Sequence, residues 1–383
     1  MAYGVAHVGK SLLWTASDLL TLYLLVSVYS VDPIVAGALF LAGLAANAVA
    51  DLAVGIWLGR RPHHAARLAG IGLAVAAASF PATVLLAPHG PVALLGATLA
   101  FRIAYAGCDV PHNALMTRLG GIPARAAWLA RVRTIGTALA ALFAAWGVGG
   151  SARIATAPML WAIAGAALLI GSTMLPLLSR FPPVPDDRRP RPGRSIGLPP
   201  TFLAANVIGI VALGALAKAV LHLPAVAPHA ANDGVSILAL LIVGRSAAAL
   251  IPIRLGSAPR HGLILQSAAF VAGGSVAAGF AWSTAPAMLV ALGVVMGVTN
   301  LIGWALLPAL AQGPRGYGVY TMASKLALGA AGLALAGGLG HVPVFAPDVF
   351  ARFAAAIALA CLVAALLVAR RLTSPRRHGL SQS

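Results

Sequence analysis

The sequence predicts an all-α polytopic membrane protein with twelve transmembrane helices in two six-helix halves. The first observation is composition: 60% of the 383 residues are hydrophobic and only 9% are charged. Soluble domains carry about 25% charged residues, and disordered chains need low hydrophobicity, so both classes are excluded. The other two observations are the spacing of the apolar runs and the distribution of positive charge along the chain.

The apolar runs have the length of membrane spans, which need about 20 residues each. They are rich in Ala, Leu and Gly and do not alternate with polar residues, which argues against membrane strands. We expect six spans before a polar break and six after it. The predicted spans are residues 11–31, 34–58, 66–87, 91–117, 127–149 and 154–177, then 200–221, 235–254, 262–283, 286–311, 317–340 and 349–370.

The polar break between Ser179 and Pro200 contains seven prolines together with arginine and aspartate. Such a segment cannot bury a core, so it predicts a flexible linker. We therefore expect an N-terminal half at residues 1–178, a basic cytoplasmic linker at 179–199, a C-terminal half at 200–372 and a cytoplasmic tail at 373–383. An even number of spans around a central linker resembles the plan of the major facilitator superfamily.

Positive charge orients the predicted spans. With the N-terminus in the cytoplasm, 19 Lys and Arg residues fall in cytoplasmic segments, and only Arg153, Lys218 and Arg352 fall outside. Cytoplasmic loops of membrane proteins carry this excess, so we expect a multi-pass protein of the cell (inner) membrane with both termini cytoplasmic. The net charge of +18 then reflects topology, and no nucleic-acid partner is predicted.

Charged residues inside membrane spans are costly and usually mark a function. Six of them lie at a similar predicted depth, roughly 12 Å below the cytoplasmic surface at 1.5 Å per residue. Such a layer is expected of a central binding site, although the two arginines in it could instead extend to the membrane surface. The six residues are Asp18, Asp51, Asp109, Arg133, Arg245 and Lys325.

Two of these aspartates have polar neighbours one helical turn away. Asn47 precedes Asp51 by four residues, and Tyr105 precedes Asp109 by four. Carboxylate and amide oxygens suit Na⁺, and a buried carboxylate can also carry H⁺. We expect a coupling-ion site at Asn47, Asp51 and Asp109, with Na⁺ and H⁺ both open. The sequence carries no phosphate loop and no Cys/His metal spacing, so no cofactor and no further metal are expected.

Several segments carry a family resemblance. Residues 105–115, YAGCDVPHNAL, are similar to the Y-x-x-x-D-[IV]-P-x-x-[AS]-L motif of the glycoside–pentoside–hexuronide:cation symporters, the melibiose-carrier branch of the superfamily. The segment 47–55 resembles that family's D-A-x-x-D-P-x-x-G segment. The stretches around Lys10, Trp304 and Lys325 resemble its helices 1, 10 and 11, and Arg133 falls where its helix 5 has a sugar-contacting arginine.

The resemblance implies cation-coupled secondary active transport of a sugar or glycoside by alternating access. Lys325 would replace the cation in the empty carrier, and Trp304 would stack on the apolar face of a sugar. Arg102, seven residues before Asp109 on the same helix face, is expected to be a charge partner of a carboxylate. The predicted solute-binding residues are Lys10, Asp18, Tyr105, Asp109, Asn113, Arg133 and Trp304.

The chain departs from the family at two acids, because Ser11 and Asn47 stand where sugar-binding members have carboxylates. Asp18, two turns along from Ser11, is placed at the site as a replacement. These departures leave a second interpretation open, a transporter or exporter of an amphiphilic or other non-sugar solute. An integral-membrane lipid-group transferase would need paired acids or histidines at a membrane surface, which the sequence does not show. We expect a monomer that is not an enzyme, with a small solute and membrane lipid as partners.

The charge asymmetry makes a testable prediction about the linker. In a Ser195→Cys protein, a membrane-impermeant thiol reagent should label the new cysteine in inside-out vesicles and leave it unlabelled in intact cells. Labelling from outside intact cells would contradict the predicted topology.

Overall fold

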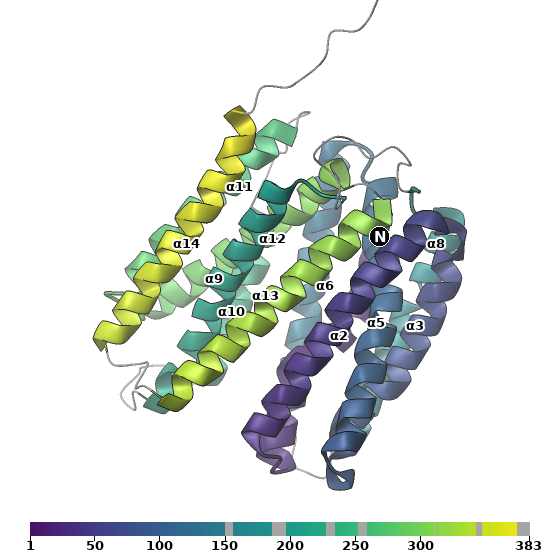
Figure 1. Cartoon of the computed structure of the whole chain (residues 1–383), viewed down its shortest axis with the longest axis horizontal. Coiled ribbons are helices and arrows are strands. Elements are labelled where there is room, and N and C mark those ends of the chain that lie inside the picture. Colours follow the sequence, from purple (N-terminus) through teal and green to yellow (C-terminus); the bar gives the residue numbers. More distant parts are fainter. Residues whose placement is uncertain are drawn as a thin grey trace, which may run out of the picture.

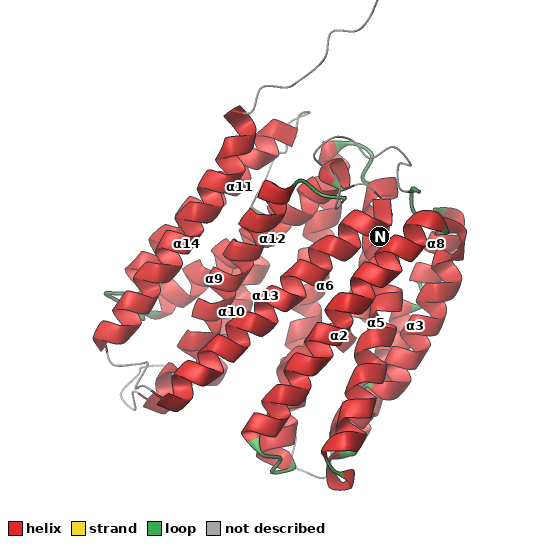
Figure 2. Cartoon of the chain, viewed as in Figure 1, coloured by secondary structure: helices red, strands yellow, loops and turns green. Residues whose placement is uncertain are grey.

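The computed structural model describes residues 1–149, 156–185, 197–226, 234–251, 259–311, 313–341 and 347–373. The described residues form twelve helical spans and no strand (Figure 2). The N-terminal half contains α1 (Ala2–Tyr23), α2 (Pro33–Arg60), α3 (Ala65–Ser79) with α4 (Ala82–Leu85), α5 (Pro91–Leu119), α6 (Pro123–Gly149), and α7 (Thr156–Gly171) with α8 (Met174–Arg180). The C-terminal half contains α9 (Pro200–Val226), α10 (Gly234–Ala247), α11 (Pro259–Gly279), α12 (Pro286–Leu310), α13 (Gly313–His341) and α14 (Pro347–Thr373).

Proline marks the start of most spans. At the first helical position a backbone N–H would have no partner within the helix, so proline loses nothing by lacking one. Its fixed φ also suits a helix. The start of α2 also has a side-chain cap, since Asp32 accepts hydrogen bonds from the backbone N–H groups of Ile34 and Val35 at 2.9 and 3.0 Å. The prolines that begin helices are Pro33, Pro91, Pro123, Pro200, Pro259, Pro286 and Pro347.

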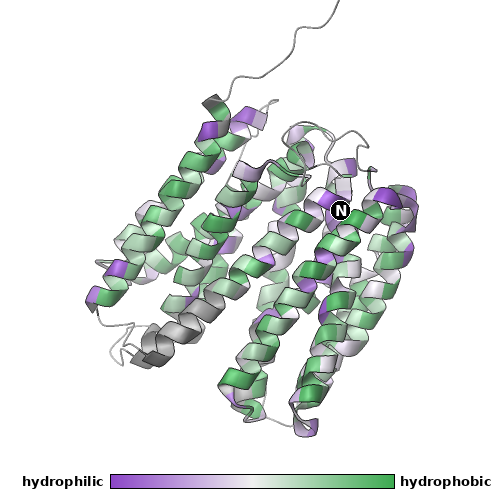
Figure 3. Cartoon of the chain, viewed as in Figure 1, coloured by the Kyte–Doolittle hydropathy of each residue, from purple (hydrophilic) through white to green (hydrophobic). Residues whose placement is uncertain are grey.

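Nine helices in the described part of the chain are long and apolar enough to cross a membrane. Hydrophobic residues dominate the helices over much of their length (Figure 3). Helix α1 is more polar, and most of its polar side chains are buried within the protein. Those buried along it are His7, Lys10, Ser11, Thr15, Ser17 and Thr21.

The start of the first span was predicted too late. Helix α1 begins at Ala2 and not at residue 11, so Lys10 lies inside the helix and is 3% exposed. Its assignment to a cytoplasmic segment is therefore wrong, although the remaining cations keep the same asymmetry. The hydropathy pattern missed the first turns because their polar residues are buried among other helices. Most of the predicted linker and tail, residues 186–196 and 374–383, lie outside the described residues.

Among the described residues, the hydrophobic cluster that the two halves share joins them at one end of the molecule. The largest buried cluster joins residues of both halves, such as Leu115 and Leu307, near the end that carries the N-terminus (Figure 1). At the opposite end, each half has its own cluster in the described residues, around Leu39 in the N-terminal half and around Leu216 in the C-terminal half. We call the shared end the closed end; by the predicted topology it faces the cytoplasm.

Glycines allow helices α2 and α13 to touch at the closed end. A Cβ atom on Gly55 would lie 2.9 Å from the carbonyl oxygen of Pro314 and 3.2 Å from the Cα of Gly318. Nearby, the hydroxyls of Thr117 in α5 and Tyr317 in α13 are 2.9 Å apart and share a hydrogen bond. Backbone-to-backbone packing of this kind needs small residues, so a larger side chain at Gly55 should separate the halves.

We predict that Gly55→Leu opens the closed end, because overpacking a tight contact costs about 1–3 kcal/mol. The reporter is a cysteine at Ala126, a buried residue beside a hollow that α5 and α6 form with α11 and α12. Labelling of this cysteine from the cytoplasmic side should become several-fold faster. The two native cysteines are buried and should contribute little to the signal. Gly37→Leu on the same helix is the control, because a Cβ there meets nothing within 4 Å. Equal labelling rates in the two variants would contradict this account of the closed end.

Candidate functional site

One lysine of the C-terminal half contacts two aspartates of the N-terminal half. The Nζ of Lys325 in α13 donates to Oδ2 of Asp51 in α2 at 2.6 Å and to Oδ2 of Asp109 in α5 at 3.2 Å. All three side chains are buried. Two buried carboxylates would repel each other without a cation between them, so the ammonium stands where a bound cation would neutralise the pair.

A second lysine completes the neutralisation of Asp109. The Nζ of Lys10 in α1 donates to Asp109 Oδ1 and, at 3.4 Å, to Oδ1 of Asn113. The Nδ2 of Asn113 donates to the same Asp109 oxygen at 2.9 Å. The ring of Tyr105 lies beside both ammonium groups, 6.0 Å from that of Lys10 and 5.6 Å from that of Lys325. Asp109 is therefore held by two lysines and an amide, with an aromatic ring beside the two ammonium groups.

Asn47 lies beside Asp51, as the spacing predicted. Its Nδ2 donates to the backbone oxygen of Arg102 at 2.7 Å and lies 3.5 Å from Asp51 Oδ1. Its Oδ1 is buried and has no hydrogen-bond partner among the described residues. A buried amide oxygen without a partner, one turn from the Asp51 carboxylate, is a ligand of the kind that Na⁺ prefers.

Arg133 makes a second contact between the halves. Its Nη1 donates to Asn113 Oδ1 at 2.6 Å and to the Tyr3 hydroxyl at 3.2 Å, and its guanidinium carbon lies 3.6 Å from the ring centre of Trp304 in α12. A guanidinium over an indole face is a favourable cation–π contact. The ring face of Trp304 on which a sugar was expected to stack is thus covered by Arg133 in this conformation.

Two residues of the predicted layer do not join the cluster. Asp18 in α1 and Arg245 in α10 are both exposed. Along α1, Lys10 is buried, Trp14 is half-buried and Asp18 is exposed, although successive members are one turn apart on one face. This gradient follows the separation of the halves away from the closed end. The charge of Asp18 still interacts with Arg245 and with Arg102, so these residues remain electrostatically linked beside the cluster.

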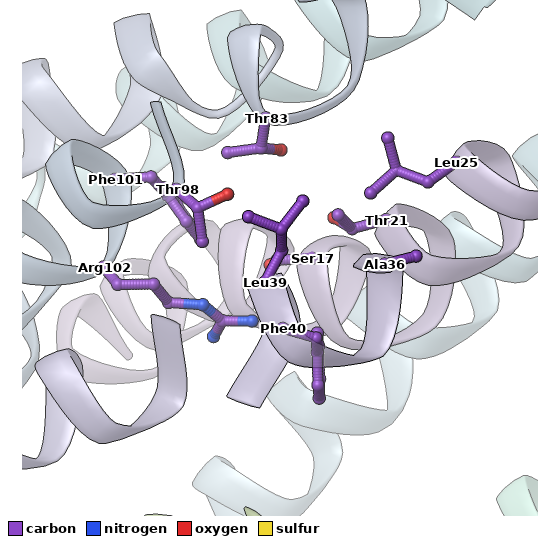
Figure 4. A pocket seen from close by; sticks show the side chains of 10 residues that line it. All are labelled: Ser17, Thr21, Leu25, Ala36, Leu39, Phe40, Thr83, Thr98, Phe101 and Arg102. Atoms are coloured by element: carbon purple, nitrogen blue, oxygen red, sulfur yellow. The ribbon is translucent and has the colours of Figure 1, made fainter. Parts of the chain in front are cut away.

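Arg102 is buried, and its carboxylate partner, Asp18, interacts with it only at longer range. No ion pair in the described part of the chain includes it, and its guanidinium lies 5.1 to 5.3 Å from the ring centres of Trp14, Phe40 and Phe101. It borders a cavity of about 10 Å³ that is also lined by hydroxyl side chains of α1, α4 and α5 (Figure 4). A space of this size holds about one water. The hydroxyl-bearing residues are Ser17, Thr21, Thr83 and Thr98.

The sequence interpretation missed an aromatic stack beside the charge cluster. The ring of His112 lies 4.6 Å from that of Tyr3 and 5.4 Å from that of His7, centre to centre. His7 Nε2 is 3.2 Å from the hydroxyls of Ser11 and Thr137. Tyr3 and His7 are one helical turn apart. This spacing predicts an aromatic face only if the first ten residues are assigned to a helix.

A scan against protein-family models and a search of the curated proteins found no match. Among solved structures, the chain is similar to a bacterial homologue of the iron transporter ferroportin in an outward-facing state, with a TM-score of 0.69 and 15% identity over 96% of this chain and 98% of that one. The chain is also similar to a human organic anion transporter, with a TM-score of 0.64 and 14% identity over 96% of this chain and 98% of that one. A third similar structure is a major facilitator superfamily proton:xylose symporter, with a TM-score of 0.66 and 12% identity over 97% of this chain and 95% of that one. This multi-pass membrane chain therefore has the fold of the major facilitator superfamily, which confirms the fold class predicted from the sequence.

Proposed function

We propose that the protein is a cation-coupled secondary active transporter that moves a small solute across the inner membrane by alternating access. The observation that carries the proposal is the Lys325 ion pair, which links Asp51 and Asp109 of one half to the other half at a buried site. The structural neighbours include transporters named for iron, organic anions and xylose, so they support transport without selecting one solute.

Alternating access requires the halves to separate at the closed end, and Lys325 must then leave its two aspartates. Two buried carboxylates without that ammonium need another cation, because uncompensated charge in low dielectric is costly. A bound Na⁺ or H⁺ supplies it, with the Asn47 oxygen as an additional Na⁺ ligand. The ion thus has different affinities for the two states, which is the condition for it to shift their populations.

Solute binding is proposed at the other contact between the halves, where Arg133, Asn113 and Trp304 meet. A sugar or glycoside follows from the family resemblance of the sequence. An amphiphilic solute is the alternative, because the family's acid in the first helix is absent from position 11. In both cases we place the termini in the cytoplasm and expect a monomer.

The most direct test of coupling is Asp51→Asn, which removes one carboxylate and little volume. We expect the variant to fold and to exchange solute in counterflow, but to lose uphill accumulation driven by a Na⁺ or H⁺ gradient. Both activities are measured in the same proteoliposomes.

The matched control is Asp348→Asn at the start of α14. Asp348 forms an exposed ion pair with Arg352, and its side chain is 71% exposed, so uphill accumulation should stay at the wild-type level. Wild-type accumulation in Asp51→Asn would show that α2 does not carry the coupling ion.

A further inference from the structure

The buried charges do not balance. The described residues bury four cationic side chains and only two carboxylates. Two aspartates with Lys325 alone would leave a residual negative charge, but Lys10 is a second buried ammonium partner. The surplus is therefore positive. The buried charged residues are Lys10, Asp51, Arg102, Asp109, Arg133 and Lys325.

The surplus lies on the two arginines, since both lysines have aspartate partners. Arg102 is 2% exposed, is surrounded by three aromatic rings and borders a cavity too small for a solute. Arg133 contacts one ring, Trp304, and lies between the halves, where a carrier of this fold exposes its site. The ring contacts of Arg102 are all within its own half, whereas Arg133 contacts the opposite half, so separation of the halves would uncover Arg133 to a transported molecule.

The guanidinium of Arg133 has one unused edge. Both hydrogen bonds it donates, to Asn113 and Tyr3, come from Nη1. Among the described residues, Nε has no hydrogen-bond acceptor, and Nη2 donates no hydrogen bond either. The parallel N–H bonds of Nε and Nη2 form the edge that binds both oxygens of a carboxylate or phosphate. Asn113 and Tyr3 fix the guanidinium and leave this edge free.

We propose that the transported solute carries an acidic group, a carboxylate or phosphate, which binds the Nε and Nη2 edge of Arg133. The inference rests on the proposed transport function and narrows its solute class. Around Asp109, three cations face two carboxylates, so one acidic group makes the cluster neutral. The Asp109 charge does not repel the acid strongly, because two lysines already neutralise it.

The test uses probes in matched pairs that differ only in the acid. The pairs are methyl β-D-glucuronide with methyl β-D-glucoside, glucose 6-phosphate with glucose, and decanoate with decanol. Each is added to the full-length protein in nanodiscs at neutral pH, and the thermal unfolding midpoint and the apparent Kd are measured. The first two pairs report a water-soluble acid and the third reports an amphiphilic one.

At least one acid should bind about tenfold or more tightly than its neutral partner, as expected for charge-assisted hydrogen bonds. Arg133→Gln should abolish that preference, and Arg133→Lys should retain part of it, because the charge stays while the two-point geometry is lost. Arg352→Gln is the control, since the Arg352 side chain is 75% exposed and pairs with Asp348 at the start of α14. The unfolding midpoint of each ligand-free variant shows that it is folded.

The proposal is overturned if no acid binds more tightly than its neutral partner, which includes a panel without any binding. It is equally overturned if the preference for an acid persists in Arg133→Gln. The wild-type protein could show counterflow of a neutral probe and no preference for acids. That result would contradict the inference about an acidic solute and would still support the transport function. Absence of flux for every probe that binds would instead count against transport.

Discussion

The buried ion pair between Lys325 and the two aspartates is the constraint on which the conformation depends. Burying three charges is favourable only with good geometry and full hydrogen bonding, and that geometry requires α2, α5 and α13 to meet at one point. The glycine contact of α2 with α13 and the hydrogen bond between Thr117 and Tyr317 form at the same interface. Separation of the halves must break all three contacts, and of these three only the ion pair leaves charges behind.

The two buried contacts between the halves respond to different ligands. Lys325 is held by carboxylates, so a cation that binds those carboxylates competes with it. Arg133 is held by an aromatic ring and neutral groups, so it remains able to bind an acid. Cation and solute would therefore act on separate contacts of one interface. Coupling between two ligands requires such a shared element with two states.

Sequence reasoning predicted the spans and the meeting of Asp51, Asp109 and Lys325, because charges within apolar runs must find partners. Hydropathy alone put Lys10 in a loop, since it does not separate a buried polar helix start from a loop; the family resemblance was what placed Lys10 at the site. Depth along a span likewise does not reveal which face of a helix is covered, so it could not show that Asp18 and Arg245 are exposed beside the buried cluster. The contact of Arg133 with Trp304 depends on how α6 packs against α12, which no local pattern encodes.

The central claim is that Lys325 holds the halves together, and a distance between the halves tests it most directly. Spin labels at Arg60 and Arg260, exposed residues at the closed end of opposite halves, report their separation by pulsed electron resonance. The wild-type protein should show one short distance at the closed end. Lys325→Met should add a longer one, because the two carboxylates lose their shared partner. An unchanged distance distribution in a folded Lys325→Met protein would contradict the account.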